Sequence, residues 1–447
     1  MNSAPDNLLP DADARLVAWV RQAAPYIHAF RGKTFVIAFG GEVLQEGGGA
    51  QALIHDIALL DSMGIHLVLV HGARPQIDVE MKARKLKPRF HKGLRVTDAA
   101  ALECVKRAMG VTRIEIEALL SQGLPNTPMA GGFLRVTGGN FITARPVGVV
   151  DGIDHGYTGS VRKVDVEALN DALVDSDIVL MQPYGYSLTG EVFNLCMEEV
   201  AESVAIALQA TKLIYLCDAP GIVDESGELV PELTADEASE WLAAGRGITE
   251  DLGLYLPRAI RAVKQGVARA HMIDRDLDGA LLLEFFTTQG VGSVISRERL
   301  ALMRDAHVDD VPAIAGLIAP LEADGTLVSR GRERLEREID RFSVLEHDEV
   351  IMGCAAFYPY VDEAMAELAC LAVMPEYRRH GYGEQILSYV EGRARAEKIK
   401  RLFVLTTVTA HWFVERGFVE AGVDALPRVR RDAYNPQRRS KVLVKVL

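Results

Sequence analysis

Short apolar runs alternate, along the first 295 residues, with longer segments whose apolar positions recur every three or four residues. The runs are continuous rather than alternating, which is typical of strands buried on both faces of a parallel sheet. The expected strands are residues 33–39, 66–70, 177–181, 212–217, 271–274 and 292–295. The expected helices are residues 16–30, 53–63, 198–208, 235–242 and 259–270. Residues 134–137 and 141–145 are expected to pair as a hairpin around Gly138-Gly139-Asn140. The pattern predicts an open, mostly parallel α/β sheet with helices on both faces.

A different order of elements follows residue 300. The pattern predicts helices at 311–321, 333–341 and from Glu384, a hairpin of 343–345 with 350–357, strands ending near Met374 and at 402–407, and a short helix at 411–416. A chain of 447 residues is also too long for one hydrophobic core. We therefore expect a loose N-terminus over 1–15, a first domain over 16–295, a charged linker over 296–300 and a second α/β domain over 301–447.

Composition excludes several classes of function. The net charge of −13 argues against general nucleic-acid binding, and the short basic stretch near the C-terminus fits small anions better. Five scattered cysteines without zinc spacing predict no disulfide framework and no metal site. The chain has neither a basic-then-apolar leader at its start nor an apolar run of membrane-spanning length. We expect a cytoplasmic protein with no membrane and no nucleic-acid partner.

One loop in the last third has the composition of a phosphate-binding turn. Pro375 ends an apolar strand, and the cations Arg378, Arg379 and His380 precede Gly381 and Gly383. The glycines permit a sharp turn, and the unpaired amides of the next helix suit a pyrophosphate. Taken alone, the same residues also fit an ordinary turn between a strand and a surface helix.

The surrounding order of strand, Arg/Gly loop, helix, strand, helix and the sequence ERGF resembles the GNAT acetyltransferase superfamily. The resemblance implies that this part binds acetyl-coenzyme A as co-substrate. The implied contacts are Leu371, Val373, Arg378, Arg379, His380, Gly381, Tyr382, Gly383 and Glu384.

Acetyl transfer to an amine requires a base, since amino acids carry ammonium groups at neutral pH. Glu367 is the candidate, because it precedes the segment that faces coenzyme A in the superfamily. An edge-strand carboxylate pointing to solvent is the alternative reading. Thr406 or its neighbour Thr407 is a candidate for protonating the leaving thiolate, and the resemblance favours Thr406. Cys370 raises the alternative of an acyl-cysteine, but no His/Asp partner pattern accompanies it, so we expect direct transfer.

The first domain resembles the amino acid kinase fold, most closely acetylglutamate kinase. The glycine turns Gly40-Gly41 and His71-Gly72, together with FNLCMEEVA and DAPGI, carry the resemblance. The kinases have a lysine where this chain has Ala38, and an Asn-x-Asn-x-Asp pattern where it has Cys196 and Glu198 in the second and third places. Arg258 replaces a second family lysine. Because phosphoryl transfer depends on such charges, we expect a kinase-shaped domain without kinase activity.

The first domain is also similar to the arginine-sensitive members of that family. There an N-terminal helix mediates hexamers and arginine binds beside it, which implies a homo-hexamer here. The implied arginine site consists of Tyr26, Phe30, His271, Glu284 and Gly290. A carboxylate such as Glu284 pairs well with a guanidinium. Two aromatic residues on one apolar helix face and a solvated glutamate are the simpler alternative.

The two domains together resemble the bacterial N-acetylglutamate synthases over nearly the whole chain. The resemblance implies acetylation of L-glutamate and feedback inhibition by L-arginine. It places the substrate carboxylates near Arg330, Cys370, Arg438 and Ser440. Two alternatives stay open: a bifunctional synthase and kinase, and an arginine-sensing binding protein with an inert transferase domain.

Overall fold

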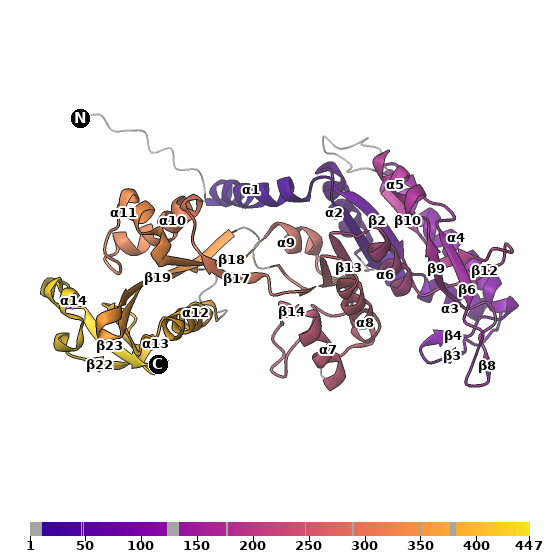
Figure 1. The fold of residues 1–447 in the computed structure, drawn as a ribbon. Coiled ribbons are helices and arrows are strands. Elements are labelled where there is room, and N and C mark those ends of the chain that lie inside the picture. Colours follow the sequence, from indigo (N-terminus) through magenta and orange to yellow (C-terminus); the bar gives the residue numbers. More distant parts are fainter. Residues whose placement is uncertain are drawn as a thin grey trace, which may run out of the picture. The chain divides into compact units, whose positions relative to one another are not determined.

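The computed structural model describes residues 11–45, 47, 49–122, 134–175, 178–245, 247–287, 290–347, 350–375 and 381–447. Residue contacts divide the chain into two compact units, Met1–Arg299 and Leu300–Leu447 (Figure 1). Each unit has its own sheet and its own hydrophobic clusters. The division falls within residues 296–300.

The main sheet of the first unit has eight strands: β1 (Thr34–Phe39), β2 (His66–His71), β5 (Val136–Thr137), β10 (Ile178–Met181), β13 (Lys212–Cys217), β14 (Glu232–Thr234), β15 (Arg269–Asp274) and β16 (Ser293–Ser296). They lie in the order β14-β16-β15-β13-β1-β2-β10-β5. Every neighbouring pair is parallel except β15 with β16. The predicted mostly parallel sheet is therefore confirmed.

Helices cover both faces of this sheet. One face packs against α5 (Val166–Val174), α6 (Met197–Ala207), α7 (Ala235–Ala244) and α8 (Glu250–Lys264). The other packs against α1 (Asp11–Phe30), α2 (Ala50–Ser62), α4 (Ala99–Ser121) and α9 (Ala280–Phe286). Along β1, Val36 and Ala38 join the first cluster, whereas Phe35, Ile37 and Phe39 join the second. Successive side chains point to opposite helix layers, which is why the strand is apolar at every position from Phe35 to Phe39.

A second sheet in the same unit was not predicted. Its strands β6 (Ile142–Pro146), β9 (Gly159–Val164), β11 (Tyr184–Tyr186) and β12 (Val192–Asn194) lie in the order β12-β11-β6-β9. Helix α3 (Arg74–Ala83) and the hairpins β3 (Phe90–His91) with β4 (Leu94–Arg95) and β7 (Val149–Val150) with β8 (Ile153–Asp154) complete the unit.

The predicted hairpin of residues 134–137 with 141–145 is wrong. β5 pairs in parallel with β10 in the main sheet, whereas β6 pairs with β9 in the second sheet. Gly138 serves a close approach rather than a hairpin turn, because a Cβ atom there would lie 2.7 Å from the carbonyl oxygen of Leu180. The glycine-rich segment thus carries the chain from one sheet to the other.

Several helix boundaries also differ from the prediction, among them those of α8 and α1. Helix α8 ends at Lys264 rather than near residue 270, because Gly266 has a φ of +109°, a conformation that no helix continues through. Helix α1 begins at Asp11, so residues 11–15, which we expected to be loose, are helical.

The second unit has a seven-stranded sheet: β17 (Ala301–Asp305), β18 (Phe342–His347), β19 (Val350–Tyr360), β20 (Met365–Val373), β21 (Arg401–Thr406), β22 (Val419–Ala421) and β23 (Lys441–Val446). The order is β17-β18-β19-β20-β21-β23-β22, and only β20 with β21 is parallel among the described pairs. Its helices are α10 (Val311–Ala323), α11 (Arg332–Arg337), α12 (Tyr382–Ala396), α13 (Ala410–Val414) and α14 (Arg428–Asp432). The predicted α/β character of this part is confirmed.

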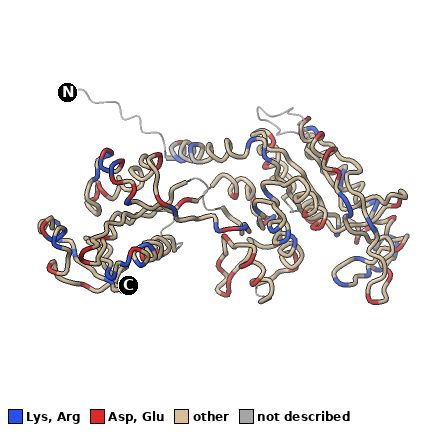
Figure 2. Tube along the Cα trace, in the orientation of Figure 1, with Lys and Arg blue, Asp and Glu red and all other residues tan. Residues whose placement is uncertain are grey.

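Charged residues of both signs are interspersed along both units (Figure 2). Among the residues described above, no helix combines the length and the apolar character needed to cross a membrane.

Candidate active site

Strands β20 and β21 diverge in the middle of the second unit's sheet. Their parallel pairing joins Met365–Glu367 to Arg401–Phe403. Beyond these residues, both strands line two cavities. A bulge accompanies the divergence, because β20 has one more residue than β19 between the pairs Ala369–Ala356 and Ala372–Cys354. Within the bulge, Cys370 has a φ of +51°, which is uncommon for a residue with a side chain.

The first cavity has a volume of about 430 Å³. It brings together the four residues that the resemblance assigns to the substrate, Arg330, Cys370, Arg438 and Ser440, and adds Glu367. Arg330 precedes α11, Glu367 and Cys370 lie on β20, and the other two residues precede β23. Distant parts of the sequence therefore converge on one cavity.

Glu367 is buried, with 7% of its surface exposed, and it forms a bidentate ion pair with Arg430. Its Oε2 accepts a hydrogen bond from Nε of Arg430 at 2.6 Å, and its Oε1 accepts one from Nη2 at 3.1 Å. These hydrogen bonds raise the pKa of Arg430. The alternative of a solvated edge-strand carboxylate is wrong, because β20 lies between β19 and β21. Sequence reasoning missed Arg430, and the available signal was the basic character of the C-terminal stretch.

Arginines outnumber carboxylates around this cavity. Among the described residues that line it, Arg330, Arg334, Arg430 and Arg438 are cationic and Glu367 alone is acidic. The buried Nε of Arg330 has no hydrogen-bond partner among these residues. Arg438 donates to the carbonyl oxygens of Gly325 and Thr326, at 2.8 and 3.2 Å, rather than to an acid. The surplus of positive charge suits a small ligand with more than one carboxylate.

The thiol of Cys370 is a poor nucleophile. Burial raises its pKa to about 11, so it is protonated at neutral pH. This favours direct transfer over an acyl-cysteine intermediate.

The second cavity, of about 340 Å³, adjoins the first at the bulge, because both are lined by Cys370 and Leu405. Leu371, Val373 and Thr406 also line it. The hydroxyl of Thr406 accepts hydrogen bonds from the backbone N–H groups of Val408 and Thr409, at 3.3 and 3.0 Å. It also shares a hydrogen bond of 3.0 Å with Oγ1 of Thr409, and this pair places a hydroxyl network at the end of β21.

The predicted phosphate loop is described in part. Arg378, Arg379 and His380 lie outside the described residues, whereas Gly381, Tyr382, Gly383 and Glu384 form the start of α12. Gly381 has a φ of +76°, and a Cβ atom on Gly383 would lie 3.2 Å from the Trp412 ring. Both glycines are therefore required where the chain enters α12, at a helix end suited to anions.

No group of three or more His, Cys, Asp or Glu side chains is arranged to hold a metal ion within the part of the chain that the structure describes.

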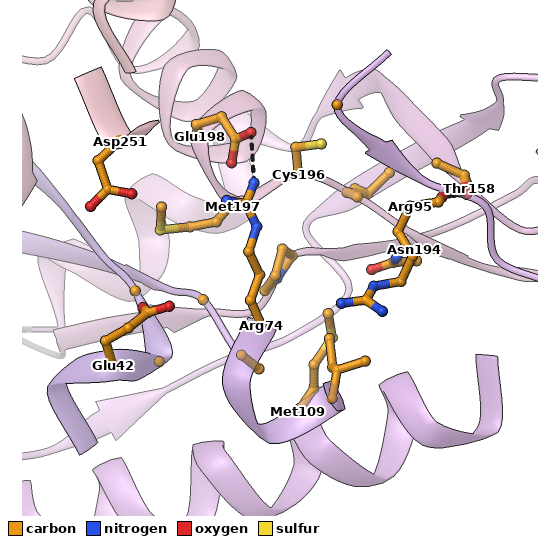
Figure 3. A pocket seen from close by; sticks show the side chains of 18 of the residues that line it. Glu42, Arg74, Arg95, Met109, Thr158, Asn194, Cys196, Met197, Glu198 and Asp251 are labelled. Atoms are coloured by element: carbon orange, nitrogen blue, oxygen red, sulfur yellow. Dashed lines mark hydrogen bonds and ion pairs between the residues drawn. The ribbon is translucent and has the colours of Figure 1, made fainter. Parts of the chain in front are cut away.

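A separate crevice lies in the first unit, at the carboxyl ends of β1 and β2 (Figure 3). Gly40, Gly41 and Gly72 line it. Arg74, at the start of α3, points across it toward Glu198, and Nη2 of Arg74 lies 3.4 Å from Oε1 of Glu198 (Figure 3). An ion pair thus spans the crevice.

Two positions expected to matter for kinase chemistry turn away from this crevice. Ala38 is fully buried in the sheet. Arg258 pairs with Glu202 at 3.0 Å and is not among the described residues that line the crevice. Neither position supplies the crevice with a cation.

The five residues of the expected arginine site include a tightly connected buried pair. Nδ1 of His271 lies 2.7 Å from Oε1 of Glu284, and a Cβ atom on Gly290 would lie 2.6 Å from Oε2. Tyr26 and Phe30 are neighbours on α1, with ring centroids 6.1 Å apart, and both pack on the cluster that contains α9. Sequence-distant members are thus placed on the same side of the main sheet.

The protonation of the pair is set by burial and by hydrogen bonds. Burial lowers the pKa of His271 to about 4, so its ring is neutral at pH 7. Burial alone would raise the pKa of Glu284, but hydrogen bonds from His271 and from backbone amides hold it below its usual value. Neutral His271 therefore donates to an ionised Glu284.

Comparison with known proteins gives consistent results for both units. The chain matches the amino acid kinase family over residues 33–274 and the acetyltransferase (GNAT) family over residues 317–418. It is 54% identical to the amino-acid acetyltransferase of Ralstonia nicotianae, over 97% of this chain and 96% of that protein. It is 49% identical to the amino-acid acetyltransferase of Azotobacter vinelandii, over 96% and 99% respectively.

Two solved structures are similar over the same extent. Both are of N-acetylglutamate synthase from Neisseria gonorrhoeae, which is 41% identical and covers 96% of this chain and 99% of its own. The complex with coenzyme A and L-arginine has a TM-score of 0.85, and the complex with coenzyme A and N-acetylglutamate has 0.61.

Proposed function

The chain belongs to the amino-acid acetyltransferases, with an amino acid kinase-like part and a GNAT part, and on this basis we propose that it is an N-acetylglutamate synthase. It moves the acetyl group of acetyl-coenzyme A to the α-amino group of L-glutamate, the first step of arginine biosynthesis. The transferase domain is residues 301–447, the regulatory domain is residues 16–295, and residues 296–300 link them. The proposed location is the cytoplasm.

The observation that carries the proposal is the arginine-rich cavity around Glu367, which adjoins the opening between β20 and β21. L-Glutamate has two carboxylates and one amine. Arg330 and Arg438 bind the carboxylates, Ser440 adds a hydrogen bond, and Cys370 contributes to the wall. This arrangement places the amine between Glu367 and the thioester.

The donor occupies the second cavity. Coenzyme A lies along Leu371 and Val373, with its pyrophosphate at Gly381–Glu384 and at the cations Arg378, Arg379 and His380. The backbone amides of Leu371 or Val373 hold the thioester oxygen, which gains negative charge as the amine attacks.

The reaction forms one bond and breaks one. Glu367 takes a proton from the ammonium group, and the free amine attacks the acetyl carbonyl carbon. The new C–N bond forms, the C–S bond breaks, and the hydroxyl network at Thr406 delivers a proton to the thiolate. The ammonium gives up two protons overall, one to the thiol and one to solvent.

The first unit regulates the second. L-Arginine binds at Tyr26, Phe30, His271, Glu284 and Gly290, and inhibits because it binds the less active arrangement more tightly. The solved complex of the Neisseria gonorrhoeae protein with L-arginine supports the choice of effector. Helix α1 mediates a homo-hexamer, which light scattering after gel filtration tests directly.

The alternative of a bifunctional synthase and kinase is disfavoured by Ala38 and by the Arg74–Glu198 ion pair in the crevice. The alternative of an inert transferase domain is disfavoured by the adjoining cavities and buried Glu367.

A thiol-release assay with acetyl-coenzyme A tests the function. Thiol release that depends on L-glutamate and falls on addition of L-arginine is expected. Substituting Glu367→Gln should lower kcat by about 100-fold or more, because a positioned base contributes that much, while coenzyme A binding stays within about twofold. The matched control Glu420→Gln changes an exposed glutamate of β22 and should leave kcat unchanged. Normal turnover by the Glu367→Gln variant would show that Glu367 is not the base.

A further inference from the structure

The proposed base is engaged by another side chain. Both carboxylate oxygens of Glu367 accept hydrogen bonds from Arg430, in the fork-to-fork geometry that is strongest for this pair. A carboxylate held in this way loses its pairing when it takes up a proton. In the arrangement described here, both oxygens of Glu367 are therefore occupied by Arg430, and the carboxylate must change partners before it can accept a proton from the substrate.

Arg430 is in a position from which it can move away from Glu367. Arg430 comes from α14, a helix of five residues, and its side chain is 25% exposed against 9% for that of Glu367. Leaving without a replacement would strand a buried carboxylate and an unpaired guanidinium, which is unfavourable. Exchange of one carboxylate for another at Arg430 keeps the number of charged hydrogen bonds constant.

The rest of the cavity supplies the reason for such an exchange. The incoming acceptor brings two carboxylates. Arg334 already pairs with Glu338, but Arg330 and Arg438 form no ion pair with a described acid, and Arg438 is bound only to the carbonyls of Gly325 and Thr326 among its described partners. Arg430 lines the same cavity and already presents two N–H groups in carboxylate-binding geometry.

We propose that Arg430 exchanges partners: it holds Glu367 in the free enzyme and passes its bidentate pairing to a carboxylate of L-glutamate when the acceptor binds. Glu367 is then released to take the proton from the amine. This inference rests on the proposed function, in which glutamate is the acceptor and Glu367 the base. Arg430 is a positioning residue, since it acts on the reaction through Glu367 and through the placement of the substrate.

The exchange protects the donor when no acceptor is present. In hydrolysis, water replaces the amine: the C–S bond breaks, a C–O bond forms, and acetate and the thiol leave. This reaction also needs a base to take a proton from water. While Glu367 is paired with Arg430 it does not act as this base, so acetyl-coenzyme A is not hydrolysed before glutamate binds.

The experiment measures thiol release with and without L-glutamate in wild type, Arg430→Gln and Arg430→Lys. For Arg430→Gln, the KM for glutamate should rise about 100-fold, as expected for loss of a charged bidentate contact, while kcat at saturation falls less than about threefold. Release without glutamate should rise about tenfold. Arg430→Lys keeps the charge without the fork and should restore the KM to within about tenfold of wild type.

Two further variants separate this mechanism from general disruption. Arg431→Gln changes an exposed neighbour on α14 and should behave as wild type. In the double variant Glu367→Gln with Arg430→Gln, release without glutamate should return to the wild-type level, because the freed base is gone. Melting curves show whether a variant is misfolded. If Arg430→Gln is misfolded, the KM of Arg430→Lys for glutamate tests the exchange instead.

The outcomes are distinguishable. If wild type responds to glutamate but neither Arg430 variant changes the KM or the release without glutamate, the exchange is wrong and the proposed function stands. If wild type shows no glutamate-dependent release, the proposed function and the exchange both fail.

Discussion

His271 and Glu284 share a hydrogen bond of 2.7 Å in the interior of the first unit, and Lys212 approaches the other side of the imidazole ring, with Nζ 3.2 Å from Nε2. Oε2 of Glu284 also accepts from the N–H groups of Val291 and Gly292, at 2.8 and 2.9 Å. Three of about four acceptor positions on the carboxylate are thus filled. A guanidinium that pairs with both oxygens finds a free acceptor position on Oε1, but on Oε2 it must displace the N–H group of Val291 or that of Gly292.

The variant Glu284→Gln tests the arginine site. It removes the anion that pairs with a guanidinium, so the arginine concentration for half-inhibition should rise at least about tenfold. Uninhibited turnover should stay within about twofold, because the proposed chemistry lies in the second unit. Inhibition curves from the thiol-release assay provide the measurement, with Glu240→Gln, an exposed change on α7, as control. Unchanged inhibition would place the arginine site elsewhere.

Kinase activity is expected to be absent. Purified protein with ATP and N-acetylglutamate should release no ADP above the blank in a coupled assay. The substitution Ala38→Lys should not restore activity, since position 38 is fully buried and the Arg74–Glu198 pair spans the crevice. It should instead lower the free energy of unfolding by about 3 kcal/mol or more, because it buries a charge. Sustained ADP production by wild type would reverse this conclusion.

Thr406 is expected to matter for both stability and turnover. Thr406→Ala removes an acceptor for two backbone N–H groups and should cost about 1–2 kcal/mol of unfolding free energy. If its hydroxyl delivers the proton to the thiolate, kcat should also fall about tenfold or more, and Thr406→Ser should recover both quantities. The neighbouring exposed Thr407 gives the control Thr407→Ala. Full turnover in Thr406→Ala would exclude a chemical role for the hydroxyl.

Asp56 makes stability depend on pH in a defined direction. Burial raises its pKa from 3.8 to about 6, although backbone hydrogen bonds from α9 partly oppose the shift. A raised pKa means that the protonated form stabilises the fold fully below pH 4, and that this contribution is lost as pH rises through 6. A rise of the pKa from 3.8 to about 6 corresponds to roughly 3 kcal/mol of unfolding free energy.

The substitution Asp56→Asn imitates the protonated carboxyl group. Its unfolding free energy should match wild type near pH 4 and exceed it by up to about 3 kcal/mol at pH 7. Urea denaturation of both proteins at a series of pH values measures the difference. A difference that does not vary with pH would show that burial of Asp56 is not the cause.

Sequence patterns predicted the elements well where a single cause determines them. The strand β1 is apolar at every position from Phe35 to Phe39, because helices cover both faces of the sheet. The segment at Gly138 shows the limit. A glycine marks either a turn or a close backbone approach, and only the position of β10 decides between them.

The residues of the candidate site also fall into those that the sequence could predict and those that it could not. The gathering of Arg330, Cys370, Arg438 and Ser440 followed from family motifs, since no local pattern distinguishes these from other surface residues. Arg430 was missed because it lies 63 residues from Glu367. The demand of a buried carboxylate for a partner is predictable, but the identity of that partner depends on tertiary structure.

The single additional residue at the bulge changes which face of the sheet the following side chains of β20 point to. Before the bulge, the even-numbered residues Ala366 and Leu368 contact the α12 side of the sheet. After it, the odd-numbered residues Leu371 and Val373 contact that side. In a strand without a bulge, side chains alternate strictly, so even-numbered residues would have faced α12 throughout. The proposed base, Glu367, and the main chain proposed to bind coenzyme A can thus lie on one continuous strand and still face two different molecules. Deleting one residue of the bulge would turn the side chains on one half of β20 to the opposite face of the sheet, and no side-chain substitution would reverse this.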